Sequence, residues 1–84
     1  MITRRYTVDV PAAAVDLFLV LFEELTGEHG ACEGVLAAYN ADNRQILFSI
    51  DDGPQAEDRL DLALTFASFY VRGWQAGKRY REGR

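Results

Sequence analysis

Residues 54–81 constrain the fold most, because their apolar residues recur at helical spacing in two separate stripes. The first stripe follows one arc at 100° per residue and consists of Ala56, Leu60, Ala63, Leu64, Ala67, Val71 and Trp74. The second follows a different arc and consists of Leu62, Phe66, Phe69 and Gly73. A surface helix needs only one such stripe. We therefore expect the first stripe to face the core and the second to face another helix, another chain or a partner.

The remainder of the chain shows strand and helix patterns in alternation. Residues 2–10 alternate apolar and polar side chains, which predicts a half-buried strand. Residues 12–26 predict a helix. Its expected core arc is Ala14, Val15, Leu17, Phe18, Leu21, Phe22 and Leu25. Residues 32–39 and 44–50 predict a hairpin, since Asn and Asp between them favour a turn.

This order of elements, β-α-β-β-α, predicts a two-layer α+β sandwich with both helices on one face of a three-stranded sheet. Residues 1–84 form a single domain, because two cores in so short a chain would be too small. Glycines weaken the long helix, so the basic C-terminal end, residues 78–84, can fray. The expected uncovered face of the sheet consists of Thr3, Arg5, Thr7, Val35, Tyr39, Gln45 and Leu47.

Charge is distributed unevenly along the chain. Residues 1–71 carry four basic and twelve acidic residues, a net charge of −8. Residues 72–84 carry five basic residues and one acidic residue, a net charge of +4. Complementarity to the dipole of the long helix explains much of this asymmetry. Residues 1–71 thus form an acidic body, and residues 72–84 form a basic tail.

No motif for catalysis, a cofactor or a metal stands out. His29 and Cys32 are the only histidine and cysteine, whereas a structural zinc site needs four ligands. We interpret them as a surface histidine and a small buried cysteine, so no enzyme and no cofactor is predicted. The acidic pairs at 51–52 and 57–58 lack EF-hand spacing and suit helix capping.

The longest strongly apolar run, residues 17–22, is far too short to span a bilayer. A lone cysteine permits no intrachain disulfide. We therefore expect a cytoplasmic protein with no membrane partner.

A protein partner is the expectation that the surface pattern favours. Acidic residues on both helices and on the turn, together with apolar residues outside the core arcs, provide the candidate contacts. These are Asp16, Leu19, Val20, Glu23, Asp42, Glu57, Asp58, Asp61, Leu62, Phe66 and Phe69. Acidic patches speed encounter with a nucleic-acid-binding protein and compete for its cationic groove. The same apolar residues also fit a homodimer interface.

A compact acidic α/β chain of this size without catalytic motifs resembles small phage-encoded inhibitors, including anti-CRISPR proteins. The resemblance covers size, charge and class and includes no motif, so it transfers no functional residue. It implies a non-enzymatic protein that occludes a host nucleic-acid-binding complex.

Two alternatives remain open. A nucleic-acid-associated module would use the basic segment, with Arg72, Lys78, Arg79 and Arg81 as its candidate contacts. The acidic overall charge disfavours it, as does the place of Trp74 on the core arc. A small dimeric ligand-binding domain would use the second apolar stripe, but the sequence shows no signature of a ligand pocket.

Overall fold

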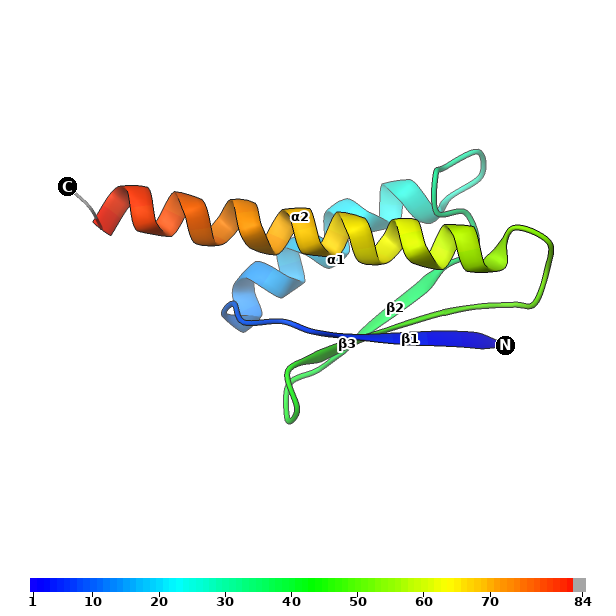
Figure 1. The fold of residues 1–84 in the computed structure, drawn as a ribbon, viewed down its shortest axis with the longest axis horizontal. Helices are drawn as coiled ribbons and strands as arrows, with labels where there is room; N and C mark the ends of the chain where they lie inside the picture. The colour runs from blue at the N-terminus through cyan, green and yellow to red at the C-terminus, as the bar shows by residue number, and fades with distance from the viewer. Residues whose placement is uncertain (83–84) are drawn as a thin grey trace.

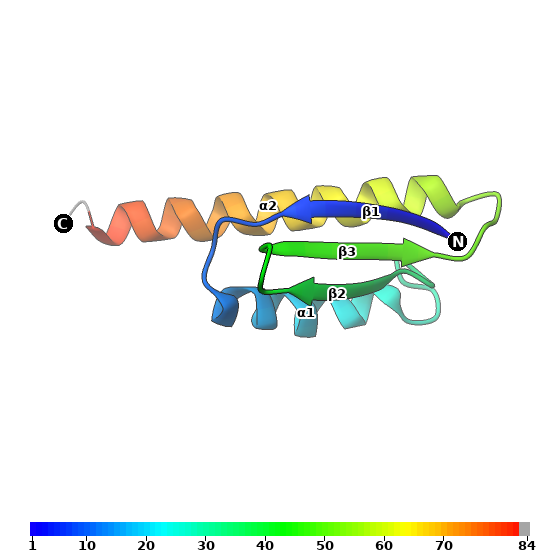
Figure 2. The same cartoon turned by 90° about the horizontal axis from the view of Figure 1, so that it is seen from below.

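The computed structural model describes residues 1–82, with side chains through Arg79. The elements are β1 (Ile2–Thr7), α1 (Ala12–Thr26), β2 (Leu36–Asn40), β3 (Gln45–Ile50) and α2 (Ala56–Glu82). The strands form one antiparallel sheet in the order β1-β3-β2. Both helices cover the same face of this sheet (Figure 1, Figure 2). The predicted two-layer α+β fold is confirmed. The last two residues of the predicted basic end, 83–84, lie outside the residues that the structure describes.

Helix α2 is longer than the sheet on which it packs. Its 27 residues span about 40 Å, whereas a six-residue strand spans about 20 Å. The C-terminal part of α2 therefore projects past the sheet, beyond the turn between β2 and β3 (Figure 1). This projection makes the molecule elongated, with extents of 48 × 27 × 17 Å.

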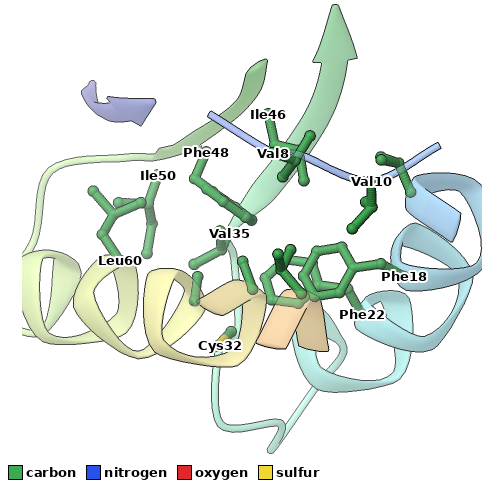
Figure 3. Close-up of a cluster of buried hydrophobic side chains, with 14 of the residues drawn as sticks. Val8, Val10, Phe18, Phe22, Cys32, Val35, Ile46, Phe48, Ile50 and Leu60 are labelled. Atoms are coloured by element: carbon green, nitrogen blue, oxygen red, sulfur yellow. The ribbon is translucent and has the colours of Figure 1, made fainter. Parts of the chain in front are cut away.

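The first apolar stripe of α2 packs on the sheet, as predicted. Its buried members are Ala56, Leu60, Ala63, Ala67 and Val71, while Leu64 and Trp74 are half-buried against the same core. Phe48 of β3 lies at the centre of this core, in contact with Phe22 of α1 at 5.5 Å between ring centroids (Figure 3). Burial of these side chains is the main source of stability in so small a fold.

Helix α1 buries a narrower arc than its sequence pattern predicts. Ala14, Val15, Phe18 and Phe22 are buried, and Leu25 is half-buried. Leu17 and Leu21, which we expected in the core, are exposed. The sheet and α2 are the two neighbours that cover α1 (Figure 2), and neither of them covers these two leucines fully.

The prediction of which residues of the second strand lie on the open face of the sheet is wrong. Val35 is buried and Tyr39 is half-buried against the core, although both were assigned to the open face. The turn between β2 and β3 has four residues, 41–44, and it pairs Asn40 with Gln45 and Tyr39 with Ile46. Because residues opposite each other point to the same side of a sheet, Tyr39 shares the core side of Ile46.

The loop between α1 and β2 folds back on the end of α1 and carries Cys32 into the core. The Cys32 amide donates to the Leu25 carbonyl at 2.8 Å, which satisfies an acceptor in the last turn of the helix. A Cβ at Gly30 would collide with that same carbonyl, so this close approach requires glycine. The Arg59 guanidinium of α2 donates to the Glu33 carbonyl at 3.2 Å and ties the loop to the second helix.

Candidate interaction surfaces

The structure separates His29 from Cys32. Cys32 is 0% exposed, and burial raises the pKa of its thiol, with the Arg59 cation acting weakly in the opposite direction. The His29 side chain is exposed, and its Nε2 lies 3.5 Å from a carboxylate oxygen of the neighbouring Glu28. A protonated thiol without access to solvent is a poor nucleophile. Among residues 1–79, no group of three or more His, Cys, Asp and Glu side chains could hold a metal ion.

A set of exposed apolar side chains lies on the outer surface of the helical layer, which we name the helix face. Its members on α1 are Leu17, Val20 and Leu21, which are 55%, 62% and 52% exposed. Its members on α2 are Leu62 and Phe69, the latter 64% exposed. Val20, Leu62 and Phe69 were predicted contacts, whereas Leu17 and Leu21 were missed because helical spacing alone assigns them to the core arc.

The α1 members of the helix face lie near the boundary between the helices. Tyr70 of α2 donates its hydroxyl hydrogen to the Ala14 carbonyl of α1 at 2.7 Å. Leu17 and Leu21 follow Ala14 by three and seven residues, so they share its side of α1. Phe66 precedes Tyr70 by four residues and therefore lies on the side of α2 that faces α1. Leu62 precedes Phe66 by four residues and lies next to it on α2. Phe69 lies farther from α1, where it lines a hollow with Tyr6 of β1 and Arg72.

Two of the predicted apolar contacts belong partly to the core. Leu19 and Phe66 are half-buried and pack against the buried cluster. The second stripe of α2 is thus shared: Phe66 supports the monomer, while Leu62 and Phe69 remain on the surface. The stripe therefore makes intramolecular contacts at Phe66 and is exposed at Leu62 and Phe69.

Exposed carboxylates lie on both helices near the helix face, whereas Phe69 has the cation Arg72 beside it. Those of α1 and α2 whose side chains are described form what we name the acidic rim, consisting of Asp16, Glu23, Glu24, Glu57, Asp58 and Asp61. Within residues 1–79, no rim residue has an ion-pair partner. Asp42 does not join them, because it lies in the turn between β2 and β3, where its amide bonds the Asn40 side chain at 2.9 Å. The rim gives the helical layer a local negative potential.

The opposite face of the sheet is open and nearly neutral. It carries three cross-strand rows: Thr3, Ser49 and Leu36; Arg5, Leu47 and Ala38; and Thr7, Gln45 and Asn40. The predicted members Thr3, Arg5, Thr7, Gln45 and Leu47 are confirmed, Ser49 is added to them, and Leu36, Ala38 and Asn40 replace Val35 and Tyr39. Arg5 is the sole charged side chain in these nine positions, so this face differs in character from the helical layer.

The basic residues of α2 divide between two places. Lys78 and Arg79 line a cleft of about 720 Å³ under the projecting part of the helix, together with Tyr39, Arg44 and Trp74. Arg72 lies outside it, beside Tyr6 and Phe69 in a smaller hollow. The Arg81 side chain falls outside the described side chains. Sequence spacing could not place Arg44 here, because it comes from the turn of a distant hairpin.

No helix within the described part of the chain is both long and apolar enough to cross a membrane. Comparison with known proteins finds no relative: no family model, no curated protein and no solved structure matches the chain. Function must therefore be argued from the surfaces themselves.

Proposed function

We propose that this chain is a non-enzymatic protein-binding module that engages its partner through the helix face. The observation that carries the proposal is the group of large apolar side chains exposed across both helices near the acidic rim. Single exposed apolar residues are ordinary, but a group of them rimmed by polar residues marks interaction sites.

The arrangement matches the anatomy of a protein interface. Apolar and aromatic anchors at the centre of an interface supply most of its affinity, and surrounding residues exclude water. Phe69 is the largest exposed anchor, and Leu17 and Leu21 lie on the neighbouring helix. The acidic rim adds long-range attraction and raises the rate of encounter more than the final affinity.

The charge of the rim selects the chemistry of the partner. A complementary surface carries basic side chains around an apolar centre, which is common in proteins that bind nucleic acid. The sharpest form of the proposal is an inhibitor of the anti-CRISPR type, which occludes the nucleic-acid-binding groove of a host complex. A second copy of the chain is a poorer occupant of this face, because two acidic rims would then oppose each other.

A pull-down with matched variants tests this proposal. Tagged protein is incubated with a lysate treated with nuclease, and the captured protein is compared between wild type, Leu17→Ser and Leu36→Ser. Both leucines are exposed, but Leu36 lies on the open sheet face and serves as the control. We expect a discrete partner that Leu17→Ser loses and Leu36→Ser retains. Equal capture by all three proteins would exclude the helix face as the binding surface.

Charge reversal tests the rim separately. The triple variant Glu57→Lys, Asp58→Lys and Asp61→Lys should slow association with the captured partner strongly at low salt and weakly at high salt. An association rate that is unchanged at low salt would contradict a role for the rim.

A further inference from the structure

The cleft under the projecting part of α2 gathers cationic and aromatic side chains from three separate segments, and we name it the basic cleft. Arg44 comes from the turn between β2 and β3, Tyr39 from the end of β2, and Trp74, Lys78 and Arg79 from α2. The turn lies at the end of the sheet past which α2 projects (Figure 2). The helix dipole explains basic residues near the end of α2, but it does not explain why a hairpin arginine faces the same cleft.

The backbone holds Arg44 in place at this end of the sheet. Its φ of 55° lies in the left-handed region, where glycine and asparagine are the favoured residues. The Val8 amide donates to the Arg44 carbonyl at 2.9 Å and anchors the turn to the segment after β1. An arginine here carries the cost of this conformation and contributes a cation that glycine would lack.

The basic cleft is positive although the chain as a whole is negative. Its ionisable lining consists of the cations Arg44, Lys78 and Arg79 and the carboxylate Asp9, a net charge of +2. Within residues 1–79, neither Arg44 nor Arg79 has an ion-pair partner. Among the residues whose side chains are described, the carboxylates of α2, Glu57, Asp58 and Asp61, lie near its other end, in a molecule 48 Å long. Charges more than about 10 Å apart are largely screened at moderate ionic strength, so the local cations set the potential in the cleft.

Aromatic side chains line the same cleft. Trp74 and Tyr39 are half-buried, so part of each side chain remains accessible to a ligand. The Lys78 ammonium lies 5.7 Å from the centre of the Trp74 ring, which places positive charge directly beside an aromatic surface. Proteins that bind single strands combine these two elements, with cations for the phosphates and aromatic rings for the bases.

We propose that the basic cleft binds a nucleoside phosphate, with Arg44 and Arg79 on the phosphate and Tyr39 and Trp74 against the base. The nucleoside phosphate is either a free nucleotide or part of a single nucleic-acid strand that crosses the cleft. This site is independent of the helix face, and its test does not involve the protein partner.

Fluorescence of Trp74, the sole tryptophan of the chain, reports binding directly. The probes are single-stranded DNA of about ten thymidines, thymidine monophosphate and inorganic phosphate, each titrated at low salt. Quenching by the strand alone identifies a strand site, and comparable quenching by the mononucleotide identifies a nucleotide site; both outcomes support the proposal. The proposal is overturned if inorganic phosphate binds as tightly as thymidine monophosphate. It is also overturned if neither the strand nor the mononucleotide binds at millimolar concentration.

Charge variants then locate the site. Arg79→Glu should weaken binding of the tighter probe about tenfold or more at low salt. Arg72→Glu is the matched control, because it makes the same charge change on the same helix outside the cleft; we expect a change of less than about twofold, since phosphate contacts act at short range. Equal losses in the two variants would show diffuse attraction to the helix end and would refute the site.

Arg44→Gly separates binding from folding. Glycine adopts a positive φ freely, so this variant should fold at least as well as the wild-type chain. It removes the hairpin cation, and we expect an affinity loss similar to that of Arg79→Glu. For a strand, the slope of log affinity against log salt should also fall by about one. A folded Arg44→Gly protein that binds like wild type would exclude Arg44 from the site and overturn the proposal.

Discussion

Replacing Leu21 by alanine tests whether the helix face is truly outside the core. Leu21 follows the core spacing of α1, yet the structure leaves 52% of it exposed. Full burial of a leucine contributes about 1.5–3 kcal/mol, and Leu21 realises only about half of this. Alanine retains part of the contact and favours helix by a few tenths of a kcal/mol. We therefore expect Leu21→Ala to lower the unfolding free energy by less than about 1 kcal/mol.

Leu60→Ala is the matched comparison on α2. Leu60 is fully buried, so its truncation removes transfer energy and leaves a cavity, at a cost of about 2–5 kcal/mol. Urea denaturation followed by circular dichroism measures both values, provided that the m-values agree. A loss of about 2 kcal/mol or more in Leu21→Ala would show that this side chain is part of the core. The helix face as described would then not exist.

Four further predictions concern the contacts that hold the helices and the loop. Gly30→Ala should destabilise the fold by about 1–3 kcal/mol, because its Cβ meets the Leu25 carbonyl; an unchanged melting temperature would contradict this close approach. Tyr70→Phe removes the hydrogen bond to Ala14 and should cost about 0.5–1.5 kcal/mol in thermal or urea unfolding, whereas no loss would argue against the helix–helix anchor. Native Cys32 should react with thiol reagents only on unfolding, and rapid labelling of folded protein would show that it is accessible. Because burial raises the pKa of the folded thiol, the unfolded chain loses this proton first, and stability should fall as the pH rises above about 8.5 by an amount that Cys32→Ala abolishes.

Periodicity predicted the elements and the core of α2, because burial of one helical stripe dominates the energetics of a small two-layer fold. It assigned Leu17 and Leu21 wrongly, since spacing reports which side chains share an arc and not how much of that arc a neighbour covers. Tyr39 was misplaced for a different reason. Cross-strand pairing decides which face a hairpin residue takes, and the pairing of Tyr39 with Ile46 puts Tyr39 on the core side, which alternation within its own strand did not indicate.

The basic cleft was only partly predictable. Lys78 and Arg79 stood out as a charged run, and Trp74 was assigned to the core by its arc. The projection of α2 past the sheet places Trp74 beside the cleft, a consequence of the difference in length between helix and strands. Arg44 joined them through tertiary packing alone, and no local signal in the sequence indicates this convergence.

The most direct test of the central claim is the affinity of the isolated partner for Phe69→Ser and for Leu36→Ser, measured by calorimetry beside the wild-type chain. Both residues are about two-thirds exposed, at 64% and 66%, so neither substitution should affect folding strongly. We predict that Phe69→Ser weakens binding at least about tenfold, or about 1.4 kcal/mol, while Leu36→Ser binds as wild type does. Equal affinities for Phe69→Ser and wild type, or a loss confined to Leu36→Ser, would contradict binding through the helix face.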